Sequence, residues 1–349
     1  MEPLDREAVA RVDAAGELGL ILELSAQLRD ALWRVESAAL APVDAPGGMV
    51  VAATGATALG GALARAILGD RASRSIGRTQ VYGLPSWATG QALVLCASYS
   101  GETEETLAAY EAAGALGAPR VVVTTGGRLA EQARADGVPV IPVPGGMRPR
   151  RAVAYMTVAA LEVAALCGAG EGLRAEIDVA AAQSQELLAE WGPDGEEDSL
   201  AKSLARELHG TLPTFVGAGP TAAVAHAWRV QVNLMARQPC HAAELPAFDH
   251  DELAGWEGAA ELAPLSMVVL DDTDLHPRVQ ARMALTLDSV EGQAAYRRRV
   301  QSRGPSRTAR VLSLVLLGDL VAFYLAVLRG VDPGREGAVD ALKSALGHP

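Results

Sequence analysis

Short apolar runs alternate with segments of helical spacing through the first half of the chain. Each run is a few residues long and indicates a buried strand, whereas residues 59–68 and 105–116 have the apolar spacing of helices. Strands that alternate with helices predict a parallel, doubly wound α/β sheet, which binds ligands at the carboxyl ends of its strands. The expected strands are 49–54, 80–84, 93–98, 120–125 and 138–143.

A second α/β pattern follows a polar interruption. Residues 191–198 are rich in glycine, proline and acidic side chains, which is typical of a break between domains. Beyond it, the pattern predicts a helix at 222–236 and strands at 212–217, 241–245 and 265–270. The chain therefore contains two α/β parts of similar kind.

The two ends of the chain are expected to be helical. Residues 5–40 carry apolar side chains three and four positions apart, as helices do. The apolar run at 314–328 is interrupted by Asp319, which argues against a membrane span and indicates a buried helix. We expect a helical segment at 1–45, one α/β domain at 46–190, and a second at 199–349 that ends in helices.

Composition and charge restrict the choice of partner and compartment. The 349 residues include 42 acidic and 30 basic side chains, for a formal charge of -12, which disfavours nucleic acid as a partner. Cys96, Cys167 and Cys240 are too scattered for a disulfide framework or a metal site. The first residues lack the apolar segment of a signal peptide, so a cytoplasmic location is expected.

The turn after the strand at 93–98 carries the clearest candidate chemistry. It contains Ser98, Ser100, Gly101 and Thr103, and a helix is expected to begin near Glu104. Free N–H groups and the positive end of the helix dipole make a helix start an anion site. Because ordinary capping needs one hydroxyl, three hydroxyls around a glycine favour a phosphate ester as the ligand.

Two further segments indicate the same kind of ligand. The turn after the strand at 49–54 contains Gly55 and Thr57, but it lacks the Gly-x-Gly-x-x-Gly spacing of a dinucleotide site. Arg148, Arg150 and Arg151 gather at a predicted helix start. Since cations there oppose the helix dipole, this cluster is expected to serve an anion.

The turn after residues 93–98 resembles the signature of the sugar isomerase (SIS) domain, Ser-x-Ser-Gly-x-Thr-x-Glu-Thr. The matching residues are Ser98, Ser100, Gly101, Thr103, Glu105 and Thr106. The earlier turn is similar to the Gly-x-Gly-Gly-Ser-Ala loop of SIS proteins. There, Ala53 and Ala56 replace glycines and Thr57 replaces the serine.

The second half of the chain resembles one SIS family. Residues 225–237 and 244–256 are similar to two segments of the bifunctional phosphoglucose/phosphomannose isomerases, and the likeness runs from about residue 45 to 345. It implies two SIS subdomains of flavodoxin-like topology and a homodimer with shared active sites. The implied reaction interconverts glucose 6-phosphate or mannose 6-phosphate with fructose 6-phosphate. The resemblance implies neither a metal nor a cofactor.

The resemblance also implies roles for individual residues. Arg150 would stabilise the enediolate, while His250, from the neighbouring subunit, and Lys343 would assist ring opening. The phosphate ligands that it implies are Thr57, Ser98, Ser100 and Thr103, in loops that also contain Gly55 and Gly101.

Two positions depart from the family pattern. Leu234 stands where the family has the glutamate that transfers a proton between C1 and C2, and leucine cannot transfer a proton. Gly334 stands where the family often has threonine, near the C2 end of the sugar. Glu244 is the nearest candidate substitute for the base, although the family has a glutamate there as well.

Three functions are compatible with these residues. An isomerase weakened by Leu234 is the leading hypothesis, because the other catalytic positions are retained. The second is a non-catalytic sugar-phosphate-binding protein, a sensor or a partner of a sugar-phosphate enzyme, and Leu234 favours it. The third is an amino-sugar phosphate enzyme, since SIS domains also serve such reactions.

Overall fold

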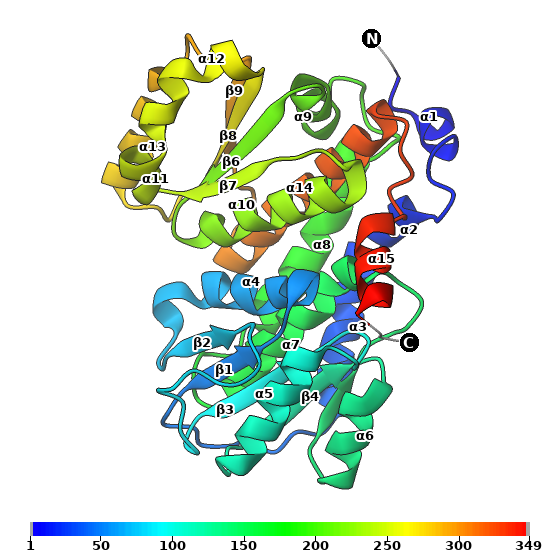
Figure 1. Ribbon diagram of the computed structural model, residues 1–349, viewed down its shortest axis with the longest axis vertical. Helices are drawn as coiled ribbons and strands as arrows, with labels where there is room; N and C mark the ends of the chain where they lie inside the picture. The colour runs from blue at the N-terminus through cyan, green and yellow to red at the C-terminus, as the bar shows by residue number, and fades with distance from the viewer. Residues whose placement is uncertain (1–2, 347–349) are drawn as a thin grey trace. The chain divides into compact units, whose positions relative to one another are not determined.

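The computed structural model describes residues 3–346, apart from the side chain of Lys343. The chain forms two compact units (Figure 1). One unit is Leu24–Ala181, and the other joins Met1–Glu23 to Ala182–Pro349. Each is an α/β structure built on a parallel sheet, as the alternation of apolar runs and helical segments predicts.

Within the described residues, the unit Leu24–Ala181 contains a five-stranded parallel sheet. The strand order is β2-β1-β3-β4-β5, which confirms the doubly wound, flavodoxin-like prediction. The order reverses between β1 and β3, where such sheets bind their ligands. The strands are β1 (Met49–Ala52), β2 (Ile76–Thr79), β3 (Leu93–Ala97), β4 (Arg120–Thr124) and β5 (Val140–Pro142).

The strand predicted at 80–84 is wrong, because β2 ends at Thr79. Val81 and Tyr82 are exposed, and the Tyr82 hydroxyl donates to Glu104 at 2.8 Å instead of facing a core. The edge strand β2 pairs only with β1, so it needs less apolar surface than a central strand. Its polar sequence therefore lacks the apolar run from which a strand is predicted. Residues 80–92 form an irregular connection to β3 in place of a crossover helix.

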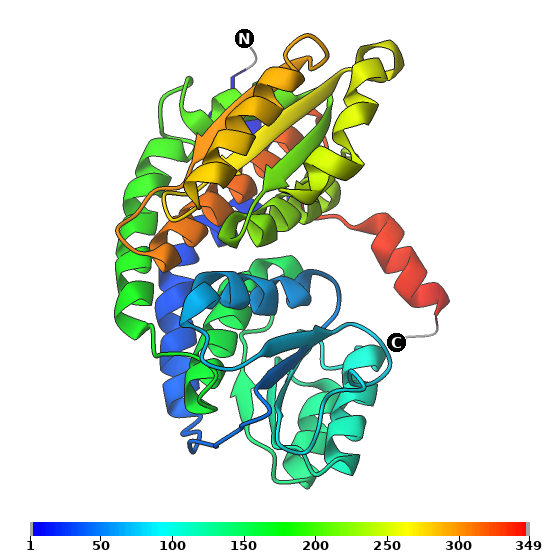
Figure 2. The same cartoon turned by 90° about the vertical axis from the view of Figure 1, so that its left-hand side faces the viewer.

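Helices cover both faces of this sheet (Figures 1 and 2). α4 and α7 pack closely together, since a Cβ on Gly60 would lie 2.3 Å from the Cβ of Met156. α5 and α6 cover the core that contains Val94 and Cys96. The helices are α3 (Leu24–Ser37), α4 (Ala58–Leu68), α5 (Glu104–Ala115), α6 (Gly127–Ala135), α7 (Val153–Leu166) and α8 (Arg174–Trp191), with 3-10 turns η1 (Gly55–Thr57), η2 (Gly69–Arg71) and η3 (Pro149–Ala152).

The second unit contains a four-stranded parallel sheet within the part of the chain that is described. Its order is β7-β6-β8-β9, so the strand order again reverses between the first strand, β6, and its neighbour β8. The strands are β6 (Leu212–Gly217), β7 (His241–Glu244), β8 (Leu265–Asp271) and β9 (Tyr296–Gln301).

The edge strand β9 has no counterpart in the sequence prediction. Its Tyr-Arg-Arg-Arg-Val-Gln sequence lacks an apolar run, and Val300 is its buried residue. Arg297, Arg298 and Arg299 pair with carboxylates on neighbouring segments. Charge on an edge strand also discourages pairing with another sheet.

The remaining helices belong largely to the second unit. They are α1 (Arg6–Ala10), α2 (Glu17–Leu22), α9 (Leu200–Leu208), α10 (Pro220–Gln231), the π-helix η4 (Val232–Ala236), α11 (Ala247–Asp251), η5 (Leu253–Gly258), α12 (Ala259–Leu262), α13 (Pro277–Ser289), α14 (Arg307–Leu328) and α15 (Gly337–Ala345).

The long apolar helix α14 is the core of this unit. It is long and apolar enough to cross a membrane, but 89% of its most apolar stretch is buried inside the protein. Gly318 admits the indole of Trp228, because a Cβ there would lie 2.3 Å from Nε1. That nitrogen donates to the carbonyl of Leu314 at 2.8 Å. The buried helix expected from Asp319 is confirmed.

Candidate functional site

The turn after β1 and the turn after β3 lie side by side at the carboxyl edge of the first sheet. β1 and β3 pair in parallel, with Met49 opposite Leu93 and Ala52 opposite Cys96. Both strands therefore end together, and η1 follows one while the Ser98–Thr103 loop follows the other. This is the point where the strand order reverses, so the two predicted phosphate-binding turns meet where sheets of this kind bind their ligands.

The Ser98–Thr103 loop is held by its own hydroxyls. Ser98 is 1% exposed, and its Oγ lies 2.7 Å from the Thr103 hydroxyl and accepts from the Gly101 amide at 3.1 Å. Ser100 is exposed, and its Oγ accepts from the Glu102 amide at 3.2 Å. Ser98 and Thr103 therefore shape the loop, while Ser100 faces solvent and can reach a ligand.

The start of α5 provides the amide groups of an anion site. The helix begins at Glu104, and its cap residue Thr103 makes no side-chain bond to the first amides of the described helix. Those amides and the helix dipole point toward the loop. The arrangement suits a phosphate held by neutral donors.

Gly101 has a structural reason to be glycine. Its φ is 73°, in the left-handed region, and a Cβ there would lie 1.9 Å from the carbonyl oxygen of Gly126. The loop after β3 thus presses directly against the loop after β4. No side chain fits between the two backbones.

The turn after β1 is more open. Gly55 has a φ of 62°, but a Cβ there would meet nothing within 4 Å, so the glycine is needed for its backbone conformation. Thr57 is buried at the last position of η1, directly before α4. A second helix start is therefore aimed at the same edge as α5.

Arg150 is brought to this edge from the far side of the sheet. It lies in η3, which follows β5 and contacts η1. Arg150 is 1% exposed and Arg151 is 4% exposed, whereas Arg148 is half-buried. The arginine cluster predicted beside an anion therefore lies near Thr57, with two of its side chains taken out of water.

His250 and Lys343 belong to the second unit. His250 is exposed near the end of α11, and its neighbour Asp249 accepts from Arg282 at 2.9 Å and from Thr286 at 2.8 Å, both on α13. Asp249 is thus committed to α13. Lys343 lies in α15, and its side chain falls outside the described part of the protein.

Leu234 occupies a π-helical turn. It is half-buried in η4, which extends α10, and π turns are frequent at functional sites. The neighbouring Asn233 amide donates to the Arg229 carbonyl at 2.8 Å. The turn ends at Arg237, whose guanidinium donates to the carbonyls of Asp332 and Arg335 at 3.1 and 3.3 Å. The two departures from the family pattern, Leu234 and Gly334, thus lie in segments that are bonded together.

The glycine at 334 is explained by packing. A Cβ there would lie 2.3 Å from the Cβ of Ala15, so a threonine requires the segment before α2 to shift. Glu244, the candidate substitute base, is exposed at the carboxyl end of β7.

The corresponding edge of the second sheet carries carboxylates instead of hydroxyls. Asp272, after β8, is fully buried and accepts from Ser302 at 2.7 Å and from Arg310 at 2.9 Å. Burial by itself raises the pKa of Asp272, but hydrogen bonds from Ser302, the Asp274 amide and Arg310 outweigh it and hold the pKa below its usual value. Internal ion pairs thus occupy this edge, and the loop of neutral hydroxyls predicted to bind phosphate belongs to the first unit.

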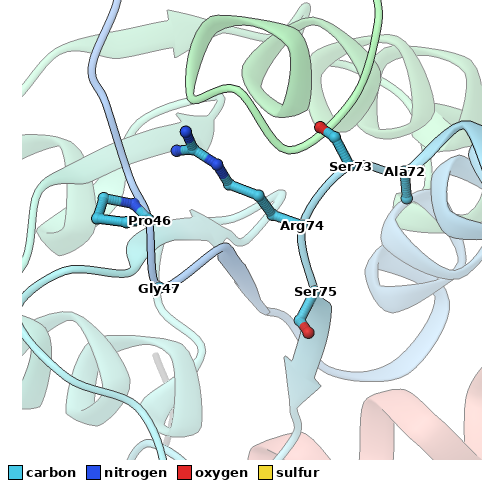
Figure 3. A pocket seen from close by; sticks show the side chains of 6 residues that line it. All are labelled: Pro46, Gly47, Ala72, Ser73, Arg74 and Ser75. Carbon is cyan, nitrogen blue, oxygen red and sulfur yellow. The ribbon is translucent and has the colours of Figure 1, made fainter.

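A groove of about 550 Å³ lies at the opposite edge of the first sheet (Figure 3). Gly47 precedes β1, and Ser73–Ser75 precede β2, so the groove is at the amino ends of these strands. The Arg74 guanidinium is already bound to the Cys167 carbonyl at 3.0 Å and to Asp44 at 2.7 Å. Because the hydroxyl loops follow the carboxyl ends of the strands, the groove is separate from them.

Among the described residues, no three His, Cys, Asp or Glu side chains gather as a metal site requires.

The role of one residue of the loop, Tyr99, was not predicted from the sequence. Tyr99, between Ser98 and Ser100, directs its phenol to the loop after β5, with the oxygen 3.0 Å from both the Pro144 carbonyl and the Met147 amide. The signature leaves this position unspecified. The only signal in the sequence was an aromatic side chain in a turn of small polar residues.

Comparisons with known proteins show the family to which this chain is similar. A family model described as the bacterial phospho-glucose isomerase C-terminal SIS domain matches residues 197–346. The bifunctional phosphoglucose/phosphomannose isomerase of Caldicellulosiruptor bescii is 35% identical over 301 residues, which cover 85% of this chain and 89% of that protein. The protein of the same name from Aquifex aeolicus is 30% identical over 265 residues, covering 76% and 79%.

The fold also has solved counterparts. The crystal structure of a hypothetical protein from Thermus thermophilus superposes with a TM-score of 0.71 at 18% identity. The match covers 98% of this chain and 92% of the other. At that identity the likeness concerns the fold alone, and it extends over both units.

Proposed function

Because the chain belongs to the bifunctional phosphoglucose/phosphomannose isomerase family, we propose that it binds a hexose 6-phosphate and interconverts the aldose and ketose forms at a reduced rate. The substrates are glucose 6-phosphate or mannose 6-phosphate, and the product is fructose 6-phosphate. The proposal rests on one observation. The Ser98–Thr103 loop directly precedes the helix α5 and lies beside η1, at the point where the strand order reverses.

The phosphate is the anchor of the substrate. Ser100 and the first amides of α5 bind it, while Ser98 and Thr103 keep the loop in shape. Thr57 and the start of α4 close the other side. Binding energy from this end of the sugar holds the reacting carbons in place.

Arg150 is the proposed stabiliser of the enediolate that forms between C1 and C2. A guanidinium held out of water acts strongly on charge that develops beside it. Since Arg150 is 1% exposed, the proposal requires a local opening around it before a sugar can make contact. His250 and Lys343 are the proposed ring-opening residues, by family resemblance.

Leu234 is the reason for expecting a reduced rate. A positioned general base is typically worth about a hundredfold to ten-thousandfold, and a half-buried leucine accepts no proton. The same residue favours the second candidate, a non-catalytic protein that binds a sugar phosphate as a sensor or as the partner of a sugar-phosphate enzyme.

The proposal includes the assembly and the subdomains. We place the protein in the cytoplasm as a homodimer with shared active sites. The SIS subdomains that we propose are residues 46–190 and 199–349, each with one of the two sheets, and the helical segment at 1–45 is divided between the two compact units at Glu23.

The test measures binding and turnover on the same purified protein. Calorimetry with glucose 6-phosphate and mannose 6-phosphate reports binding, and a coupled assay reports fructose 6-phosphate. Binding with slow turnover supports the isomerase, whereas binding with none supports the sensor or partner. Absence of binding to both sugars would overturn both candidates.

A further inference from the structure

The loop after β3 and the loop after β5 are joined by one phenol, although β4 lies between the two strands. We propose that Tyr99 is a positioning residue, which sets Arg150 at a fixed distance from the phosphate-binding loop. This inference rests on the proposed function, because it concerns the geometry of the same site.

The Tyr99 phenol bridges the two ends of a turn, in place of a direct hydrogen bond between their backbone groups. Pro144 and Met147 are the first and fourth residues of a turn, and an ordinary β-turn joins that carbonyl and that amide directly. Here the phenol oxygen lies 3.0 Å from each, donating to the Pro144 carbonyl and accepting from the Met147 amide. Gly145 and Gly146 between them are exposed. The tyrosine therefore fixes a segment that two glycines would otherwise leave adaptable.

The backbone of Tyr99 is fixed as well. Its carbonyl accepts from the Thr125 amide at 3.0 Å and from the Thr125 hydroxyl at 2.8 Å, in the loop after β4. The preceding residue, Ser98, donates its amide to the Val123 carbonyl at 3.0 Å. Tyr99 thus connects three neighbouring loops, through its backbone to the loop after β4 and through its phenol to the loop after β5.

The connection from Met147 to Arg150 is short and stiff. Pro149 has a fixed φ, and the Arg151 amide donates to the Arg148 carbonyl at 2.8 Å. A displacement of the turn at Met147 is therefore passed on to Arg150. In a hexose 6-phosphate the phosphate and the reacting carbons are at opposite ends, so the separation of their binding groups decides whether both are held.

The phenol is suited to this role because it remains protonated. Burial raises the pKa of Tyr99 above its usual value, although the hydrogen bond from the Met147 amide lowers it in part. A protonated phenol can donate and accept at once, as the two contacts require.

The experiment uses two ligands with the same phosphate and different far ends. Sorbitol 6-phosphate carries a neutral hydroxyl at C1, whereas arabinonate 5-phosphate carries a carboxylate that mimics the charge of the enediolate. Tyr99→Phe keeps the ring and removes both phenol contacts. We expect Tyr99→Phe to weaken the binding of arabinonate 5-phosphate about fivefold to tenfold, the usual effect of one or two lost hydrogen bonds. The affinity for sorbitol 6-phosphate should change less than twofold.

A double-mutant cycle shows whether Tyr99 acts through Arg150. In an Arg150→Gln background, Tyr99→Phe should cause no further loss for arabinonate 5-phosphate. Tyr110→Phe is the matched control, since its phenol donates to Asp136 at 2.8 Å in the same unit but away from the loops. It should leave both affinities unchanged. Should Arg150→Gln not fold, the comparison of the two ligands on Tyr99→Phe alone decides.

Two results would overturn the inference by itself. One is equal weakening of both ligands, which would make Tyr99 a part of the phosphate loop only. The other is no change in either. If the unmodified protein binds neither ligand, the proposed function fails and takes this inference with it.

Discussion

Ser100 is the hydroxyl of the loop that is free to meet a ligand, since Ser98 and Thr103 bond to each other. We predict that Ser100→Ala weakens hexose 6-phosphate binding by about 1 to 2 kcal/mol, the usual worth of a hydrogen bond to a charged group. Calorimetry measures the change. Ser306→Ala is the control, because Ser306 belongs to the second unit and caps α14 there by accepting from the Ala309 amide at 3.2 Å. Equal affinities of Ser100→Ala and the unmodified protein would contradict the prediction.

Substitutions at Gly101 and Gly117 distinguish two contributions to the free-energy cost of replacing a glycine, which are the strain of a positive φ and the steric overlap of a Cβ. Both have a positive φ, 73° and 66°, but a Cβ at Gly117 meets nothing within 4 Å, whereas one at Gly101 lies 1.9 Å from the Gly126 oxygen. We predict that Gly117→Ala costs about 1 kcal/mol, the left-handed penalty alone. Gly101→Ala should cost clearly more, because a backbone must also move. Urea unfolding measures both, and equal costs would show that the two loops separate easily.

Leu234 is the third position at which we expect a single substitution to change a measured property, in this case turnover. We predict that Leu234→Glu raises turnover of glucose 6-phosphate, by up to about a hundredfold. Asn233 is already committed to the Arg229 carbonyl, so the new carboxylate has few partners, its pKa is raised, and the gain appears mainly at higher pH. Leu234→Gln has the same shape without a titrating group and serves as the control. A similar gain with glutamine would exclude a role in proton transfer.

The central strands and the edge strands β5 and β7 could be predicted from the sequence, whereas the edge strands β2 and β9 could not. β1, β3, β4 and β8 are largely buried, and their apolar runs mark them. β2 and β9 pair on one side only, so a polar sequence satisfies them. The π turn η4 was also invisible, because a π turn and an α-helix have nearly the same pattern of apolar residues.

The ion pair after β8 makes the second sheet sensitive to acid. Asp272 and Arg310 are 0% and 9% exposed, and the pKa of Asp272 lies below its usual value. Its stabilising effect is therefore complete above the pKa of an unfolded carboxyl group, about 4. The effect is lost as pH falls through the lower, folded pKa.

We predict that Asp272→Asn costs about 3 kcal/mol near neutral pH, because the buried Arg310 charge loses its fully buried carboxylate partner and retains its pair with the more exposed Asp274. The difference from the unmodified protein should shrink below about pH 4. Thermal melts between neutral and acidic pH measure it. Asp288→Asn is the control, since Asp288 is 71% exposed in its pair with Arg297 and should matter little. A constant difference at every pH would show that packing, rather than charge, is lost.

At the scale of the whole molecule, two similar sheets carry different loops. The first sheet ends in neutral hydroxyls and the second in paired carboxylates, which suits the proposed binding of an anion at the first sheet by a chain with a formal charge of -12. The sequence predicted which residues of the first unit would meet, since strand order and turn position fix them. It could not predict Tyr99, because the reach of a phenol to Pro144 depends on how two loops are folded.

The proposed sharing of sites requires two copies of the chain. We predict that the protein is a homodimer, with a mass in light scattering of about twice the 36.1 kDa of one chain. The measurement is made at micromolar concentration, with and without fructose 6-phosphate. A single-chain mass under both conditions would exclude a role for His250 in the neighbouring subunit.

The unit with the second sheet is discontinuous in sequence, since Met1–Glu23 belong with Ala182–Pro349 and Ala15 packs beside Gly334. During synthesis, Leu18 and Ile21 leave the ribosome before the continuous unit does, but their own unit is completed after it, roughly 15 to 70 seconds after these two residues are made at the usual rates of elongation. The continuous unit Leu24–Ala181 can fold in that interval. Folding on the ribosome is therefore expected to begin in the middle of the chain and to finish with its two ends.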